Sequence, residues 1–255
     1  MKNILNKIEF HYTYLIMALG LVLTGHFINL IIFTSIIIIH ELGHIFTSLL
    51  FKYKINKVII YPYGGLTKQE KQINTNINND LLVALSGIII QTIYFIIVLF
   101  LYQNNIIREY TYNLFYLYHK SIIVFNVLPI IPLDGSKIIN LILSKYINYN
   151  LSNKLTIVIS FITIIIFLLS NLFEKNYSLI LVVGVLLNNI YKFYQELSYI
   201  YNRFLLERYL YNFNYSKYKL INNKDKMHKN KMHFIKYNGF VYTEKDYLNK
   251  FFQKK

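Results

Sequence analysis

The sequence predicts an all-α polytopic membrane protein with six transmembrane helices, a short membrane-associated β-hairpin and a small α+β cytoplasmic tail. Of the 255 residues, 55% are hydrophobic, and they lie in blocks instead of being dispersed as in a soluble domain. Roughly six blocks approach the 20 or so apolar residues that a helix needs to cross a bilayer. Much of the net charge of +15 lies toward the C-terminal end. A membrane domain followed by a basic tail is therefore expected.

The apolar blocks and the segments between them predict the order of elements. The expected spans are 12–30, 31–51, 81–102, 115–134, 155–173 and 178–195. Lysines alternate with apolar residues over 52–61, and Pro62-Tyr63-Gly64-Gly65 marks a turn, so a hairpin is expected there. Pro129 and Pro132 lack backbone donors and break the fourth span near its end. Residues 136–153 are expected to contain a short amphipathic helix.

The distribution of Lys and Arg over the loops predicts how the chain is oriented in the membrane. Outside the tail, ten Lys and Arg residues fall in 1–11, 52–80 and 135–154, against Arg108 and Lys175 on the other side. Cytoplasmic loops are the ones that collect Lys and Arg, so both termini are expected in the cytoplasm. The predicted division is a transmembrane domain over 1–200 and a cytoplasmic tail over 201–255.

The second span contains His40-Glu41-Leu42-Gly43-His44. Residues four apart lie one above the other on a helix, so the two imidazoles can bind one zinc ion. Glu41 is offset and better placed to exchange a proton with water beside the metal. Three ionisable groups in one span cost about 2.5–3.5 kcal/mol each and usually mark function. Since the chain has no cysteine, this pattern predicts a His- and carboxylate-bound zinc and peptide-bond hydrolysis.

A catalytic zinc takes three protein ligands and water, so one more donor is expected. Asp134 is the leading candidate, because it ends the fourth span, which runs in the same direction as the second. His26 and His119 are expected toward the opposite side, at the membrane interface, and Glu9 and His11 at the cytoplasmic boundary. Gly87 is expected at a helix-packing position.

Two motifs together resemble the site-2 protease family of intramembrane zinc metalloproteases. They are His40-Glu41-Leu42-Gly43-His44 and Asn126-Val127-Leu128-Pro129-Ile130-Ile131-Pro132-Leu133-Asp134-Gly135. Four further stretches resemble the branch of this family in endospore-forming bacteria: Ala18-Leu19-Gly20, Leu23-Thr24-Gly25-His26, Pro62-Tyr63-Gly64-Gly65 and Arg203-Phe204-Leu205-Leu206-Glu207-Arg208-Tyr209.

The resemblance implies roles for individual residues. His40, His44 and Asp134 would bind zinc, and Glu41 would be the general base. Substrate would contact four residues, Asn126, Pro129, Gly64 and Gly65. The two glycines would lie in a hairpin whose edge pairs with an extended peptide. An ordinary cytoplasmic hairpin is the alternative for the glycines.

The resemblance also implies partners and a location. The implied substrate is a membrane-tethered pro-sigma factor, cut during sporulation in the mother-cell membrane that surrounds the forespore. Membrane-protein inhibitors and the lipid bilayer are the other implied partners, and no direct nucleic acid binding is expected. The alternative function is a non-enzymatic membrane metal-binding protein or a metal transporter.

The tail departs from the family pattern. Residues 233–255 resemble only the end of a cystathionine-beta-synthase-type regulatory domain, so nucleotide control is not carried over. They predict a strand, a turn at Tyr237-Asn238-Gly239, a second strand and a helix. Residues 208–232 are rich in Lys and Asn. Two interpretations remain open for the tail, a solvated basic arm that meets anionic lipid or a truncated substrate-docking module.

Overall fold

The computed structural model describes residues 8–62, 64–169, 178–213 and 215–253. The chain forms two compact units. The first unit comprises Met1–Lys71 and Leu82–Val127, and the second comprises Gln72–Leu81 and Leu128–Lys255. Each is described by itself.

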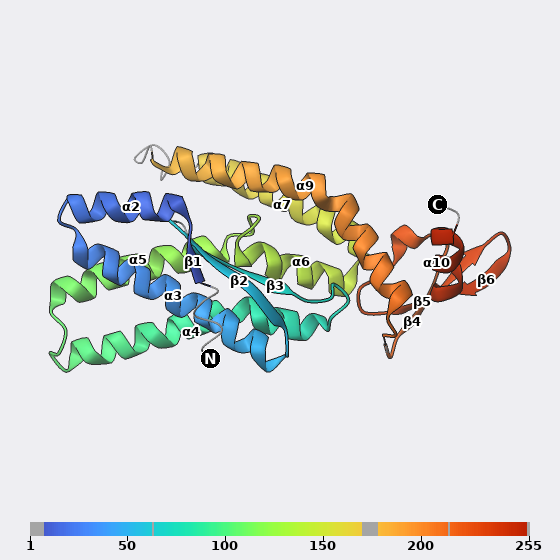
Figure 1. Ribbon diagram of the computed structural model, residues 1–255, viewed down its shortest axis with the longest axis horizontal. Helices are drawn as coiled ribbons and strands as arrows, with labels where there is room; N and C mark the ends of the chain where they lie inside the picture. The colour runs from blue at the N-terminus through green and yellow to red at the C-terminus, as the bar shows by residue number, and fades with distance from the viewer. Residues whose placement is uncertain (1–7, 63, 170–177, 214, 254–255) are drawn as a thin grey trace. The chain divides into compact units, whose positions relative to one another are not determined.

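The first unit combines helices with a small sheet (Figure 1). Its elements are β1 (Ile8–Phe10), α2 (Tyr12–Leu23), α3 (Phe27–Leu50), β2 (Lys54–Tyr61), β3 (Gly64–Glu70), α4 (Ile77–Gln103) and α5 (Glu109–Val127), with the first turn of α4 in the second unit. Buried side chains of α2, α3, α4 and α5 form one core with Ile60 of β2. This core fixes the face that α3 presents to its neighbours.

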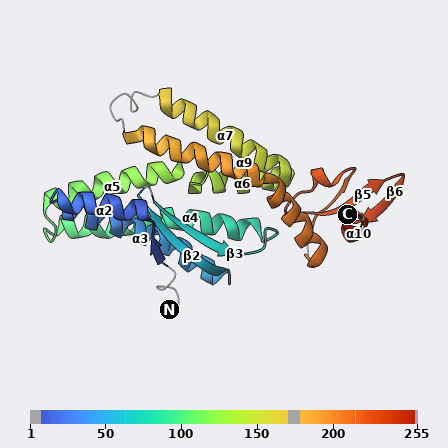
Figure 2. The ribbon, with the colours of Figure 1, turned by 45° about the horizontal axis from the view of Figure 1, so that its top comes forward.

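The sheet of the first unit has the order β1-β2-β3, which places β3 at an edge. β1 is parallel to β2, and β2 is antiparallel to β3, with Ile60 opposite Gly65. β2 and β3 lie alongside α3 in both views (Figures 1 and 2). Gly64 has a φ of 143°, a backbone conformation that favours glycine. The predicted hairpin is confirmed, and Tyr63 of the predicted turn lies outside the described residues.

The second unit contains long helices and a second small sheet. Its elements are α6 (Asp134–Tyr146), α7 (Tyr149–Leu169), α9 (Ser178–Leu210), β4 (Tyr218–Ile221), η1 (Lys224–Lys226), β5 (Met232–Tyr237), β6 (Phe240–Thr243) and α10 (Glu244–Gln253). The sheet order is β4-β5-β6. A buried cluster joins α7, α9, β4, β5 and α10, with Phe204 and Leu205 at 0% exposure.

The tail confirms one expectation and overturns another. The predicted strand, turn, strand and helix are β5, the turn at Asn238-Gly239, β6 and α10. Residues 208–232 do not form a solvated arm throughout. β4 pairs with β5, and Met227, His228 and Lys229 are buried. The physical reason is the buried apolar cluster of the second unit, in which residues of this basic stretch pack against α9.

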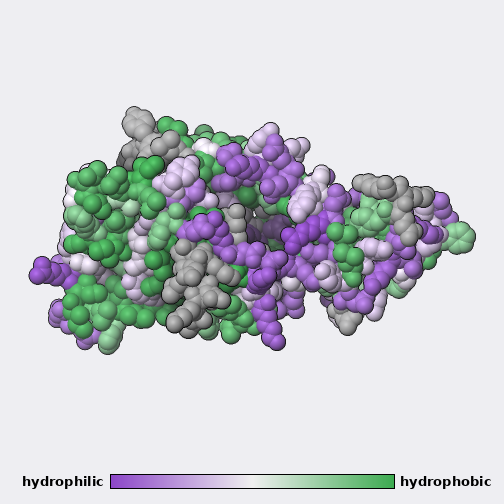
Figure 3. Space-filling model, in the orientation of Figure 1, coloured by the Kyte–Doolittle hydropathy of each residue, from purple (hydrophilic) through white to green (hydrophobic). Residues whose placement is uncertain are grey.

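Among the described residues, three helices are long and apolar enough to cross a membrane: α3, α4 and α7. Side chains exposed on α4 include Ile93, Ile96, Ile97 and Phe100. Figure 3 shows hydrophobic surface over the helices of the first unit and mostly polar surface over the tail. The six expected spans correspond to α2, α3, α4, α5, α7 and α9, but α2 has only 12 residues.

Several expected boundaries were wrong. α2 ends at Leu23 because the chain turns at Gly25, whose φ is 77°. α5 ends at Val127, before Pro129, so Asp134 does not end that helix and is instead the first residue of α6. α7 begins at Tyr149, and α9 continues past residue 195 to Leu210. Packing in the second unit buries part of each extension, including Ser152 and Asn153 of α7 and Phe204 of α9.

Candidate metal centre

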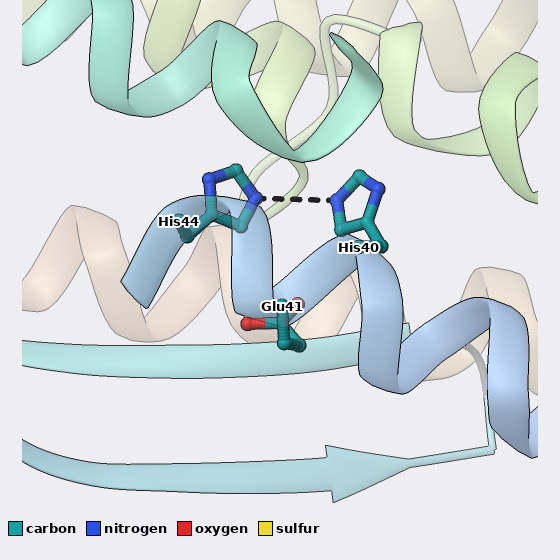
Figure 4. A group of neighbouring side chains, drawn as sticks. All are labelled: His40, Glu41 and His44. Atoms are coloured by element: carbon teal, nitrogen blue, oxygen red, sulfur yellow. Dashed lines mark hydrogen bonds between the residues drawn. The ribbon is translucent and has the colours of Figure 1, made fainter. Parts of the chain in front are cut away.

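His40 and His44 lie one turn apart on α3 and point toward α4 (Figure 4). Their side chains are buried, and their Nε2 atoms are 3.2 Å apart. Two nitrogens bound to one tetrahedral zinc at 2.0–2.1 Å lie about 3.3 Å from each other. The separation of the imidazoles therefore matches that of two ligands of one zinc ion.

Hydrogen bonds to the other ring nitrogens fix the tautomers. His44 Nδ1 is 2.7 Å from the carbonyl oxygen of Val83, which can only accept, so His44 Nδ1 donates. His40 Nδ1 is 2.9 Å from Gln91 Oε1. The amide of Gln91 is oriented by its Nε2, which donates to the carbonyl oxygen of His119 at 3.2 Å. With Nδ1 as the donor in each ring, the two Nε2 atoms that face each other are left to bind a metal.

Gly87 of α4 leaves the space beside these nitrogens open. A Cβ atom at Gly87 would lie 2.5 Å from His44 Nε2 and 2.6 Å from His40 Nε2. A Cβ at Gly43 would lie 2.5 Å from the carbonyl oxygen of Ser86 and 3.1 Å from the Cα of Gly87. Gly87 is therefore at a close helix contact, as predicted, and it also borders the imidazoles, which the prediction did not include.

Glu41 lies on the side of α3 that faces β2 and β3 (Figure 4). Its carboxylate is buried, and Thr67 Oγ1 donates to its Oε2 at 2.6 Å. One ligand atom from each of His40, Glu41 and His44 lies within 4.8 Å of the other two. The two imidazoles, with a carboxylate within 4.8 Å of both, form a donor set that fits a zinc ion with a base beside it.

The other predicted site residues have these surroundings. Gly64 and Gly65 begin β3, and Gly65 lies directly against Glu41. Asn126 is buried in α5, where its Nδ2 donates to the carbonyl oxygen of Ile122 at 3.0 Å. In the second unit, the carbonyl oxygen of Pro129 accepts a hydrogen bond from Ser160 Oγ at 3.0 Å. The buried carboxylate of Asp134 accepts a hydrogen bond from Lys137 Nζ at 2.7 Å. The structure brings together His40, Glu41, His44 and Gly65, and the roles of the others stay predictions.

Sequence reasoning missed Gln91, Thr67 and the carbonyl oxygen of Val83. Gln91 carried a usable signal, because a lone amide within an apolar span needs a partner. Thr67 carried none, since its contact with Glu41 depends on how the hairpin packs. His119 is buried and stacks on Phe95, with ring centroids 4.4 Å apart, a packing that the sequence did not indicate. Its position at a membrane interface stays a prediction.

Comparison with known proteins decides the family. Residues 28–109 match the model of peptidase family M50. The chain is 32% identical over 210 residues to stage IV sporulation protein FB of Bacillus subtilis, covering 81% of this chain and 73% of that protein. The chain belongs to peptidase family M50, the site-2 protease family.

Two further matches, both from the archaeon Methanocaldococcus jannaschii, support this membership of M50. Zinc metalloprotease MJ0392 is 31% identical over 186 residues, covering 69% of this chain and 54% of that protein. The solved structure of a site-2 protease from the same organism matches with a TM-score of 0.58 and 26% identity, covering 72% of this chain and 89% of that one.

This M50 chain is therefore an intramembrane metalloprotease with zinc as its cofactor, and His40, Glu41 and His44 can hold the metal. The alternative of a non-enzymatic metal-binding protein or transporter is wrong, because membership of a peptidase family overturns it.

Proposed function

We propose that this protease removes the N-terminal prosequence of a membrane-associated pro-sigma factor during sporulation. The observation that carries the proposal is the similarity to stage IV sporulation protein FB over most of both chains. The buried and correctly spaced His40, Glu41 and His44 supply the chemistry that such a cut requires.

In this mechanism His40, His44 and Asp134 hold the zinc ion. When bound, zinc supplies Lewis-acid chemistry, polarising the scissile carbonyl and making water acidic near neutral pH. Glu41 accepts a proton as the water oxygen attacks the carbonyl carbon. It then donates that proton to the amine nitrogen as the C–N bond breaks, which leaves a carboxylate and a free amine.

The substrate would bind as an extended strand. β3 is an edge strand in the sheet of the described residues, so its outer edge can pair with a peptide backbone. Gly64 and Gly65 at the start of β3 would lie beside that peptide, and Asn126 and Pro129 would contact it from the break after α5. Pairing of this kind suits peptidases, because a helical substrate must unwind before its backbone can be cut.

The same proposal covers topology and location. Six spans with both termini in the cytoplasm would bring water to Glu41 from the cytoplasmic side, and the membrane would be that of the mother cell around the forespore. Residues 1–200 would form the protease domain and 201–255 the tail, which serves substrate docking in this proposal. Membrane-protein inhibitors would be its regulatory partners.

Cleavage of a pro-sigma factor tests the substrate. The chain is co-expressed in a non-sporulating host with the pro-sigma factor of its own genome, and the product is sized by immunoblot. A matched control is an unrelated membrane-tethered protein of similar length. We expect shortening of the pro-sigma factor alone. Intact pro-sigma factor beside a cleaved control would contradict the assignment of substrate and leave the peptidase activity standing.

Zinc binding tests Asp134. The change Asp134→Asn keeps the size of the side chain and removes its charge, so zinc affinity is expected to fall by more than the roughly 10-fold to 100-fold that loss of an outer-shell partner costs. Chelator competition on the purified protein measures the affinity. Asp246→Asn is the control, because Asp246 accepts from Thr243 Oγ1 in an exposed pair in the tail. Unchanged affinity in Asp134→Asn would place the third ligand elsewhere.

A further inference from the structure

Two residues of β3 contact the carboxylate of Glu41. Gly65 and Thr67 are two positions apart, so both face the same side of the strand, the side toward α3. Figure 4 shows Glu41 on the strand side of α3 and both imidazoles on the other side, toward α4. The surroundings of Glu41 are therefore set by the hairpin, and those of the imidazoles by α4.

Thr67 and Gly65 hold the carboxylate in different ways. Thr67 Oγ1 donates to Glu41 Oε2 at 2.6 Å, within the range of a charge-assisted hydrogen bond. At Gly65, a Cβ atom would lie 2.5 Å from Glu41 Oε1 and closer still to Cγ and Cδ. The backbone of β3 thus supports the side chain of Glu41 where any other residue would displace it.

We propose that Thr67 and Gly65 are positioning residues for Glu41. This inference rests on the proposed role of Glu41 as the general base. A base must lie within hydrogen-bond reach of the proton that it takes, and a misplacement of about 1 Å can cost 100-fold in rate. Because Thr67 holds one carboxylate oxygen, it fixes the direction of the other. The carboxylate of Glu41 can lie against the strand only because Gly65 lacks a side chain.

Two substitutions at Thr67 test the hydrogen bond. Thr67→Val keeps the shape and removes the donor, and Thr67→Ser keeps the donor. A hydrogen bond to a charged group is worth a factor of about 10 to 100. We expect Thr67→Val to lower kcat by that factor, with KM and zinc content unchanged, and Thr67→Ser to restore most of kcat. Thr92→Val is the control, since Thr92 donates to the carbonyl oxygen of Ile88 on the outside of α4.

The substitution Gly65→Ala tests the close approach. Its methyl group would push Glu41 away, so kcat is expected to fall at least about 10-fold while the protein keeps its zinc. Gly20→Ala is the control, because a Cβ there meets nothing within 4 Å.

The outcomes of these assays bear on the positioning role of Thr67 and Gly65 and on the base role of Glu41. Wild-type kcat in Thr67→Val or Gly65→Ala overturns the inference, and so does loss of zinc in either variant or a Thr67→Ser variant as slow as Thr67→Val. Glu41→Gln separates the inference from its premise. If Glu41→Gln cleaves normally, the proposed role of Glu41 fails. If it is inactive while Thr67→Val is fully active, the positioning role alone fails.

Discussion

The two imidazoles depend on residues that lie far from them in the sequence. Gln91 orients His40, and the carbonyl oxygen of Val83 orients His44, both from α4. Partners of this kind hold the ring at the angle that a metal requires and raise its basicity. The affinity for zinc should therefore depend on Gln91 although Gln91 touches no metal.

Replacing Gln91 tests this dependence. Gln91→Met keeps the length of the side chain and removes the acceptor of the His40 Nδ1 proton, so zinc affinity is expected to fall about 10-fold to 100-fold. Chelator competition measures the change. Gln103→Met, at the exposed end of the same helix, is the matched control and should bind zinc as the wild type does. Equal affinities in both variants would contradict the role of Gln91.

The candidate ligands on α3 were predictable from sequence because they are local. His40, Glu41 and His44 share one turn of helix, and helical geometry alone places the imidazoles together. Thr67 and Gln91 meet them through tertiary packing, and no spacing in the chain encodes that contact. The burial of His119 against Gln91 and Phe95 was missed for the same reason.

At the scale of elements, the tail depends on one buried arginine at the end of α9. Arg208 donates to Asn74 Oδ1 and Glu244, and to the carbonyl oxygens of His228, Lys229 and Lys231. Its side chain is 1% exposed. A guanidinium has five N–H donors, so a single arginine can bond all of these acceptors. Arg208 thereby holds the loop before β5 in place.

The change Arg208→Lys should loosen this loop. Lysine has three donors, so at least two buried acceptors lose their partner, at a cost of about 1–3 kcal/mol each. Limited proteolysis of the full chain in detergent should then cut within 215–232 at lower protease concentration. Arg203→Lys is the control, because the Arg203 side chain is 43% exposed where it pairs with Glu207. Identical cleavage in both variants would contradict the account.

Two histidines make the tail sensitive to acid. Burial, helped by Lys219 and Lys231, lowers the pKa of His228 to about 4. Burial also lowers the pKa of His233, whose Nε2 accepts from the backbone N–H of His228 at 3.0 Å. Between about pH 4 and 6.5 the unfolded tail binds protons that the folded tail does not. The stability that the two uncharged histidines contribute to the folded tail is therefore fully present above about pH 6.5 and is lost as the pH falls toward 4.

Hydrogen exchange of the β5 amides at pH 7 and pH 5, corrected for the intrinsic exchange rate, measures this decline. We expect weaker protection at pH 5, and a smaller difference in His228→Gln, which removes one titrating group. His26→Gln, at an exposed position before α3, should behave as the wild type. Equal protection at both pH values would show that neither histidine resists protonation.

At the scale of the whole molecule, apolar blocks predicted the helices well and their ends poorly. The break after α5 was expected from Pro129, yet Asp134 begins α6, because the chain resumes a helix as soon as the prolines are passed. The basic stretch over 208–232 looked solvated in sequence. It packs because the apolar residues that bury it come from α7, α9 and α10.

The central claim is that Glu41 works as the base of a zinc peptidase in this membrane protein. The most direct measurement compares the wild type with Glu41→Gln in lipid vesicles, recording zinc per chain and the cleavage of a membrane-tethered substrate. The variant should keep its zinc and cleave about 100-fold to 10,000-fold more slowly, the usual contribution of general acid–base catalysis. Cleavage at the wild-type rate by a zinc-loaded Glu41→Gln variant would contradict the claim.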